Sequence, residues 1–518
     1  MKRIRILLTL LFVVFIFFMY SCADTPSTTL RLALSNFPVN FDLATTNEFF
    51  TRLVCENIYE YLAQTENDML VPKLASNWHF VSNSEIVVEL KDDIRFSDGT
   101  YLTSDDVVLS IERFSKKMYP RVYEIKVEKS ETADNIIHIS VVRGARSTNY
   151  LTTILSRAPI YKATYITNFD DEFLQKNPMG TGEYFLYSHI DDKIVLKKNK
   201  FNRYYKEHKK APDIVEFYHE ADLRTQFLML RDGKIDFQYQ LEFLDYQSAC
   251  LNNELKVIDK LSYYYIIMAL NSMVQYHPDI NLPSNPLRDK RVRQAIAHII
   301  DMRTYVEQTL SEKAVLLNMP TLRATRYYPT DLDYYEYDPE LSKRLMREAG
   351  VEKGFKMRLS STKGTYSIWL SDYIKHSLAK INIEVIIDYF DGAELYDSLA
   401  KSPPSAYIAT YSSSTTPRSL HNNISSFLNY DPRGVDNRRN YFKYFSVPIN
   451  ELIQKINQLD ESDVDMIVLQ KKLAQVVYDE VHIIPFFQPY NFSAMHKDIV
   501  WNHKNNNFPL ANEFQVKK

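Results

Sequence analysis

Residues 94–107, with the sequence IRFSDGTYLTSDDV, mark a boundary between two kinds of secondary structure. Residues 84–90, just before them, alternate between polar and apolar side chains, which predicts a strand with one buried face. Asp98-Gly99 is a turn signal. Thr103 then has the position of an N-cap, with two acidic residues in the first turn after it, and this pattern favours a helix start. The stretch therefore predicts a strand, a turn and a helix in succession.

Strands and helices continue to alternate outward from this stretch. Apolar alternation at 29–34 predicts the first strand, and the apolar run at 483–487 predicts a strand near the C-terminus. Helical spacing is strong at 291–300 and at 339–349, where Gly350 has the position of a C′ residue. Strands that alternate with helices over such a length predict an α/β architecture.

Length and composition are those of a large globular protein. The chain has 518 residues, 45% of them hydrophobic and 25% charged, so we expect two or three compact lobes. The net charge is only -3, and no long block of like charge is present, which argues against nucleic acid as a partner. Glycine occurs only 10 times, so we expect the glycines at turns to have a backbone reason, either positive φ or close approach.

The N-terminus has the pattern of an export signal. Lys2, Arg3 and Arg5 precede an apolar run at 6–20, which is shorter than the roughly 20 residues of a membrane span. The run ends at Ser21-Cys22, which resembles a bacterial lipobox, and a polar tether follows. We therefore expect a signal peptide at 1–21, lipidation of Cys22 and a tether at 22–28. The alternative is an uncleaved anchor, or an ordinary signal peptide with an unrelated cysteine.

The other two cysteines and the histidines give no sign of a metal site or a catalytic centre. Cys55 and Cys250 could pair, but Cys55 lies in an apolar helical run and is expected to be a core residue. A secreted hydrolase is the main rival from another class, yet the chain has no His-Glu-x-x-His and no Gly-x-Ser-x-Gly. Ser-x-x-Lys occurs at 360–363, 377–380 and 398–401, a repetition typical of background. We expect no enzyme and no cofactor.

Six motifs in order resemble one known family. The chain is identified by them as a member of the bacterial extracellular solute-binding proteins of family 5, the peptide and nickel type. They are Pro72-x-Leu74-Ala75-x-x-Trp78 with the 94–107 stretch, Pro178-x-Gly180-Thr181-Gly182-x-Tyr184, Leu230-x-x-Gly233-x-x-Asp236, Asp289-x-Arg291-Val292-Arg293-Gln294-Ala295-Ile296 with Asp301, Tyr337-Asp338-Pro339 to Gly350, and Ile483-Ile484-Pro485-Phe486-Phe487.

The resemblance implies a periplasmic binding protein of type II, in which two lobes close around a ligand like a Venus flytrap. The core of the first lobe would comprise 29–45, 170–270 and 484–518, with an extra subdomain at 46–169. The second lobe would comprise 271–483. The hinge would then lie near 269–271 and 483–485.

The resemblance also suggests ligand contacts. Peptide binders of the family hold the terminal ammonium with an Asp, but Ser414 has that position here, and no carboxylate lies between Asp397 and Asp431. An ammonium buried without a counter-charge is costly. Either another acid serves or the ligand lacks a free α-amine. The candidate ligand-binding residues are Ser35, Asn36, Asn271, Tyr411, Ser412, Ser413 and Arg418.

The function implied is the substrate-binding component of an ABC importer, a monomer that captures an oligopeptide or another small solute. Its partners would be a membrane permease and, through the lipid anchor, the membrane on the extracytoplasmic side of the cell envelope. The alternative is a binding lipoprotein that senses a ligand or acts as a peptide chaperone without transport.

Overall fold

A computed structural model describes residues 27–66, 69–119, 123–143, 148–412, 419–429, 439–459, 463–503 and 508–516. Its largest feature is a sheet of 12 strands, which we divide into two halves. The first half contains β1 (Thr29–Leu34), β8 (Tyr184–Ile190), β9 (Lys193–Lys198), β10 (Ile214–His219), β11 (Phe237–Gln238) and β12 (Leu255–Leu261). The second half contains β13 (Tyr264–Leu270), β14 (Ala314–Leu316), β15 (Phe355–Thr362), β16 (Ile383–Phe390) and β17 (Ala406–Ser412).

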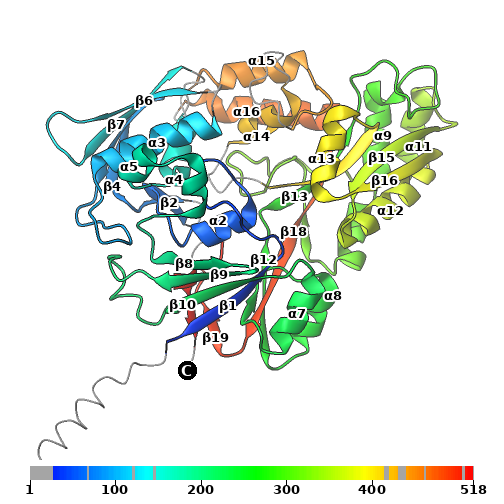
Figure 1. Ribbon diagram of the computed structural model, residues 1–518. Coiled ribbons are helices and arrows are strands. Elements are labelled where there is room, and N and C mark those ends of the chain that lie inside the picture. Colours follow the sequence, from blue (N-terminus) through cyan, green and yellow to red (C-terminus); the bar gives the residue numbers. More distant parts are fainter. Residues whose placement is uncertain are drawn as a thin grey trace, which may run out of the picture.

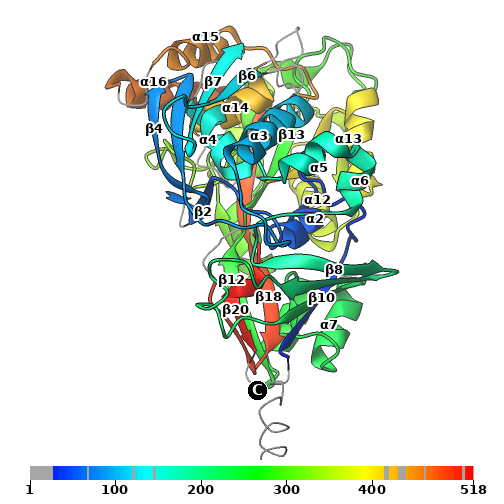
Figure 2. The same cartoon turned by 60° about the vertical axis from the view of Figure 1, so that its left-hand side comes forward.

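The strand that joins the two halves is β18 (Ile483–His496). Its first residues, Ile483 to Phe487, pair with β13, and its last, Tyr490 to His496, pair with β12. Strands β12 and β13 also follow each other in the chain, with only two residues between them. The halves are thus connected by one continuous strand and by one pair of consecutive strands, and β18 can be followed through both halves in Figures 1 and 2.

Helices cover both faces of the second half. Successive side chains of β13 alternate between two cores, with Met268 in one and Ile267 in the other, as a strand buried on both faces requires. One face is covered by α9 (Lys290–Ile299), α11 (Pro339–Glu348) and α12 (Thr365–Ala379). The other is covered by α13 (Gly392–Lys401), α14 (Leu420–Leu428), α15 (Val447–Ile456) and α16 (Asp465–Glu480). Short turns of helix precede β14: η1 (Pro286–Arg288), α10 (Met302–Thr304) and η2 (Tyr305–Thr309).

The first half is covered differently on its two faces. On one face, α7 (Leu223–Arg231) and α8 (Phe243–Cys250) pack on the sheet. On the other lie α2 (Phe49–Cys55), β19 (Ile499–Trp501), η3 (Ala511–Glu513) and β20 (Phe514–Val516). Cys55 is fully buried there, which confirms its expected core position, whereas Cys250 is exposed, and the two are not bonded.

A separate core between Leu62 and Ile160 belongs to an additional unit, seen at the left of Figure 1. A four-stranded sheet forms its centre, and helices pack against that sheet. Its elements are β2 (Ala63–Glu66), β3 (Met69–Pro72), β4 (Ala75–Ser82), β5 (Glu85–Leu90), α3 (Ser104–Met118), β6 (Glu124–Lys129), β7 (Ile136–Arg143) and α4 (Thr148–Arg157). The chain returns to the first half through α5 (Ala163–Asn168) and α6 (Asp171–Lys176).

The element boundaries predicted from local patterns are confirmed where a cap fixes them. Thr103 is the N-cap of α3, and the Asp106 carboxylate accepts hydrogen bonds from its backbone N at 2.6 Å and its Oγ1 at 2.7 Å. Gly350 follows α11 with φ +73°, as expected for a C′ residue. Strand β18 begins at Ile483, as predicted, but continues to His496, well beyond the apolar run.

Two glycines of the Gly180-Thr181-Gly182 turn are required by close backbone contact. A Cβ on Gly180 would lie 2.1 Å from the carbonyl oxygen of Ile58, and one on Gly182 would lie 2.4 Å from that of Asn57. The Gly182 backbone N donates to the Ile58 oxygen at 2.8 Å, so the turn locks directly onto the segment that follows α2. This confirms the expected backbone reason for these glycines.

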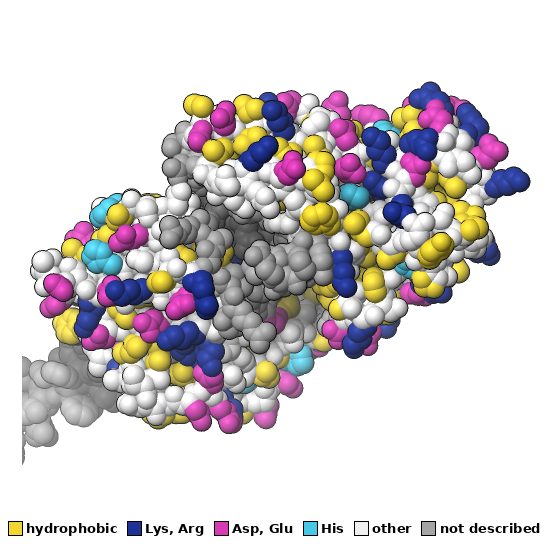
Figure 3. All heavy atoms as spheres, turned by 90° about the horizontal axis from the view of Figure 1, so that it is seen from above, with side chains coloured by type: hydrophobic (Ala, Val, Ile, Leu, Met, Phe, Trp, Pro, Cys, Tyr) yellow, Lys and Arg dark blue, Asp and Glu magenta, His cyan; other side chains and the backbone are white. Residues whose placement is uncertain are grey.

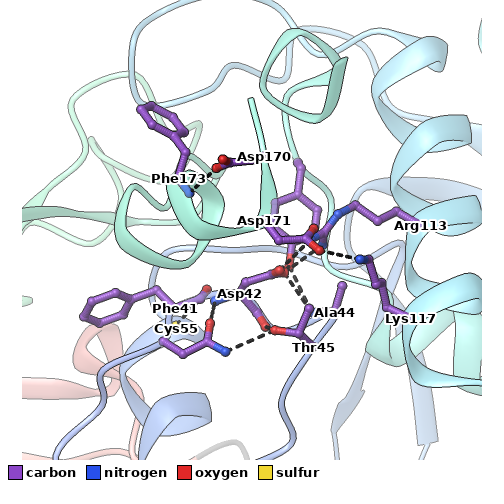
Figure 4. Close-up of polar contacts among 12 residues, drawn as sticks. Phe41, Asp42, Ala44, Thr45, Cys55, Arg113, Lys117, Asp170, Asp171 and Phe173 are labelled. Atoms are coloured by element: carbon purple, nitrogen blue, oxygen red, sulfur yellow. Dashed lines mark hydrogen bonds and ion pairs between the residues drawn. The ribbon is translucent and has the colours of Figure 1, made fainter. Parts of the chain in front are cut away.

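The additional unit is joined to the first half by a buried arginine. Figure 4 shows the Arg113 guanidinium, from α3, donating to both carboxylate oxygens of Asp42 at 2.8 and 2.6 Å, and to Asp171 at 2.7 Å. Asp42 is completely buried and also accepts from the Tyr161 hydroxyl at 2.7 Å. Burial opposes the positive charge of Arg113, but the hydrogen bonds and attraction from Asp42 outweigh it and raise its pKa.

Charges of both signs are interspersed over the face seen in Figure 3. This arrangement agrees with the near-zero net charge and provides no single-sign track for nucleic acid on that face. Among the described residues, no helix combines the length and apolar character needed to cross a membrane.

Candidate functional site

The carboxyl ends of the parallel strands in the two halves meet where the halves join. In the first half, β1 runs parallel to β10 and β11, and in the second half β15 runs parallel to β16 and β17. Open α/β sheets bind ligands outside the carboxyl ends of such strands. The two edges are linked directly, because Gln240 Nε2, just after β11, donates to the Tyr264 hydroxyl at the start of β13 over 3.2 Å. We call these the first edge and the second edge.

The first edge contains Ser35 and Asn36, as predicted, directly after β1. The Ser35 hydroxyl accepts from Gln226 Nε2 at 3.0 Å, and Asn36 Nδ2 donates to Glu48 at 3.3 Å. Glu48 caps α2 by accepting from the backbone N of Phe50 and Thr51. Asn36 is exposed and Ser35 is half-buried, so both retain surface that a solute can contact.

Aromatic side chains extend this edge toward the junction. The Tyr239 ring stacks on Phe49 with centroids 5.5 Å apart. Burial raises the pKa of the Tyr239 hydroxyl far above its ordinary value, and the neighbouring Tyr264 and Tyr263 raise it further. The Tyr239 backbone oxygen accepts from Ser493 Oγ at 2.7 Å, which fixes this loop to β18. Burial also raises the pKa of the Tyr264 hydroxyl, so Tyr239 and Tyr264 stay neutral at physiological pH and give the junction an apolar wall with polar tips.

The second edge ends at Ser412, which is exposed and pairs with Tyr264 across the β13–β17 ladder. Tyr411, one of the candidate ligand-binding residues, lies in the core, with 5% of its surface exposed. Its ring meets Phe427 edge-to-face at 4.9 Å, and its hydroxyl lies 3.2 Å from that of Tyr407. Alternation along β17 directs Tyr411 inward with Tyr407, because side chains two and four apart share one face.

An arginine that the sequence did not single out covers this part of the core. The Arg439 guanidinium lies 5.1 Å above the centre of the Tyr411 ring and donates to the Ser412 backbone oxygen at 3.0 Å. Arg439 lies 27 residues after Ser412 in the sequence. No local motif marks this residue, so only the three-dimensional structure reveals it.

Asn271 is not part of either edge. It follows β13 at the end opposite Tyr264, so about 20 Å of strand separates it from Ser412. Its backbone N donates to Ser405 at 2.8 Å, its Nδ2 donates to Pro404 at 3.2 Å, and the whole residue is buried. The structure therefore does not bring Asn271 together with Ser35, Asn36 and Ser412. Cys22, Ser413, Ser414 and Arg418 lie outside the described residues.

Two small cavities lie elsewhere. One, of about 40 Å³, is lined by residues that include Asn57, Glu60 and Glu183, and the other, of about 10 Å³, includes Ile300, Tyr335 and Pro485. Neither is lined by a residue named above for the edges. Within the described residues, no group of three or more His, Cys, Asp or Glu side chains could hold a metal ion.

Comparisons with known proteins show the family to which the chain belongs. A family model described as bacterial extracellular solute-binding proteins, family 5 Middle, matches residues 69–428, more than half of the chain. The chain belongs to this family. The oligopeptide-binding protein AppA of Bacillus subtilis is 24% identical over 413 residues, covering 71% of this chain and 73% of AppA.

Two solved structures place the fold within the same class. The periplasmic binding protein DppA from Helicobacter pylori, in complex with the peptide STSA, superposes with a TM-score of 0.76 at 19% identity, covering 95% of this chain and 99% of DppA. NikZ from Campylobacter jejuni, in complex with Ni(L-His), gives a TM-score of 0.76 at 17% identity, covering 95% and 100%. The chain thus has the two-lobed type II fold predicted from its motifs and is a solute-binding protein of the kind that serves ABC transporters, and these relatives are binding proteins rather than enzymes.

Proposed function

We propose that this protein captures a peptide or a related small solute between the first and second edges and delivers it to an ABC permease. The observation that carries the proposal is the meeting of the two carboxyl-terminal strand edges, linked by the Gln240–Tyr264 hydrogen bond. A solute held there contacts both lobes at once, so it stabilises a closed arrangement over an open one.

The strand ends at these edges suit an extended, peptide-like ligand. In the described structure, the last residue of β17 paired with β15 is Tyr407, so one side of residues 408–412 has no partner strand there. On β1, the last residue paired with β11 is Leu32, which leaves the end of β1 similarly open on that side. An extended peptide can add to such strand edges through main-chain hydrogen bonds.

We place the hinge at Ser262-Tyr263 and at residues 487–490 of β18. The sequence-based boundaries, 270/271 and 483/484, assigned β13 and all of β18 from Ile484 onward to the first lobe. The side chains of β13 pack into the two cores of the second half, so β13 is expected to move with that half. With this change, the first lobe keeps 29–45, the extra subdomain keeps 46–169 and the second lobe begins at Tyr264.

The test of captured ligand is mass spectrometry of compounds that co-purify with the chain from Ala23 onward, released by denaturation. We expect short peptides or a single small solute in stoichiometric amount. Two outcomes would contradict capture. One is recovery of a compound that also co-purifies with an unrelated protein, and the other is recovery of no compound after the chain is refolded with a peptide pool.

We also propose that the protein acts on the extracytoplasmic side of the envelope as a monomer held by a lipid on Cys22. The basic, apolar and Ser-Cys pattern at residues 2–22 supports this. The Cys22→Ser variant is expected to move from the membrane fraction to the soluble fraction. Retention in the membrane fraction would instead indicate an uncleaved apolar anchor.

A further inference from the structure

The second edge presents one positive charge that is fixed in position. Arg439 is half-buried, its Nη2 donates to the Ser412 oxygen at 3.0 Å, and its Nη1 lies 3.4 Å from the Tyr265 hydroxyl. Its guanidinium also lies over two aromatic rings, 5.1 Å from Tyr411 and 5.6 Å from Phe427. A planar guanidinium held by stacking and by backbone contact loses little further entropy when it binds a ligand group.

Arg439 forms no ion pair with a carboxylate in the described part of the chain. No carboxylate there lies within 4.0 Å of it. At the ends of β16 and β15, Asp391 is paired with Lys363 at 2.9 Å and Asp388 with Arg358 at 2.7 Å. Asp397 lies close enough to Tyr441 to act on it together with Arg439. Burial raises the pKa of the Tyr441 hydroxyl, the positive charge of Arg439 opposes that shift, and the negative charge of Asp397 adds to it.

The described residues use only some of the donors of Arg439. A guanidinium has five N–H donors in a rigid fork, and the contacts with Ser412 and Tyr265 use two of them. The others can meet a carboxylate in two parallel hydrogen bonds. Ser412 is the last residue of β17, so the fork lies at the position where an extended ligand along this strand would end.

We propose that Arg439 binds a carboxylate of the ligand, and that the protein selects solutes with an anionic terminus rather than a free ammonium. The inference rests on the proposed function, because it assumes that the ligand lies along the second edge. It also accounts for the absence of any carboxylate between Asp397 and Asp431 in the sequence, the stretch that contains the end of β17. An arginine at this edge attracts an anion and repels a cation.

The inference can be tested with a pool of short peptides supplied as matched pairs, each sequence once as the free acid and once as the C-terminal amide. The chain from Ala23 onward is equilibrated with the pool, and the bound peptides are quantified by mass spectrometry. We expect the free acids to be enriched over their amides by roughly tenfold or more, the scale of a charge-assisted bidentate contact. N-acetylated free acids should be retained as well as the unblocked ones.

Two variants and a control assign the preference to this residue. Arg439→Gln should abolish the enrichment, and Arg439→Lys, which keeps the charge without the fork, should keep only part of it. Arg303→Gln is the matched control, because Arg303 also lies over a tyrosine ring, Tyr334 at 4.9 Å, but is paired with Glu336 at 3.3 Å. That control should leave the enrichment unchanged. Unfolding curves without peptide confirm that each variant is folded.

The outcomes separate the two proposals. Equal capture of acids and amides by the parent chain and by Arg439→Gln would overturn the inference and leave peptide capture standing. Capture of neither set by the parent chain would overturn the proposed function, and the inference with it. Enrichment that disappears in Arg439→Gln but persists in Arg303→Gln would support both.

Discussion

Arg113 and Arg439 both lie against tyrosine rings, and their different partners explain their different roles. Arg113 lies 5.4 Å from the Tyr161 ring centre, is 8% exposed, and bonds to both Asp42 and Asp171. Arg439 lies 5.1 Å from the Tyr411 ring centre, is half-buried, and among the described residues has a backbone oxygen and a hydroxyl as its hydrogen-bond partners. A buried charge that is fully paired fixes the geometry of a joint, whereas a fixed charge with spare donors is available to a ligand.

The largest effect should come from breaking the paired charge. The Arg113→Met variant leaves the fully buried Asp42 without its counter-charge, which should lower the free energy of unfolding by about 3–5 kcal/mol. Urea unfolding measures the loss. Arg143→Met removes the exposed pair with Glu124 and should cost less than about 1 kcal/mol. Equal losses in the two variants would contradict the proposal that Arg113 holds the additional unit to the first half.

The contact between the Gly180–Gly182 turn and residues 57–58 should not tolerate an added methyl group. In Gly182→Ala, the new Cβ would lie 2.4 Å from the Asn57 oxygen, so backbone must shift, with an expected loss of up to about 3 kcal/mol. Gly392→Ala is the control, since a Cβ there meets nothing within 4 Å. The control should be neutral or slightly stabilising at the start of α13. A stable Gly182→Ala variant would mean that the turn is not locked against residues 57–58.

Acid should weaken the second-half core without touching the Arg439 charge. Burial, together with nearby Arg293, lowers the pKa of His482 to about 3, so the folded protein favours the neutral imidazole. The contribution of the neutral imidazole to the free energy of unfolding is complete above the pKa of about 6.5 that histidine has in the unfolded chain. It is lost as the pH falls toward 3, and the loss is about 2 kcal/mol at pH 5. Comparing urea unfolding at pH 7 and pH 5 for the parent and His482→Gln measures this difference. An unchanged pH dependence in the variant would refute the assignment.

The smallest effect is expected at Tyr411, where it separates a core role from ligand contact. Tyr411→Phe keeps the ring beneath Arg439 and removes only the 3.2 Å contact with the Tyr407 hydroxyl. The expected loss of stability is about 1 kcal/mol, with little change in the binding of free-acid peptides. Calorimetric titration and unfolding of the same sample measure both quantities. A large loss of affinity with unchanged stability would restore Tyr411 as a direct ligand contact.

Local signals in the sequence predicted the elements well, because caps and turns depend on neighbouring residues. Thr103 as N-cap, Gly350 after α11 and Ile483 as a strand start all depend on such signals. The six ordered motifs predicted the family and therefore the two-lobed fold. What local signals could not provide was the pairing of distant segments: the Arg113–Asp42 contact spans 71 residues.

The candidate site could be predicted only in part, because some of its residues are marked by local signals and others depend on the pairing of distant segments. Ser35 and Asn36 were predicted because they follow a strand, and strand ends can be seen in the pattern of the chain. Ser412 was predicted from the resemblance to the family. Asn271 was grouped with them because it also follows a strand, but the antiparallel register puts it at the far end of β13. Tyr411 was named as a candidate ligand contact, and its place on the inner face of β17 became visible only once Tyr407 and Phe427 were seen beside it. Arg439 depends on a contact across 27 residues.

The central claim is that solute binds where the two strand edges meet. Hydrogen–deuterium exchange of the chain from Ala23 onward, with and without the free-acid peptide pool, tests it most directly. The account predicts slower exchange at residues 35–37, 239–240 and 410–412, and no change in the separate core between Leu62 and Ile160. Protection confined to that core or to the cavity beside Glu60, with the two edges unchanged, would contradict it.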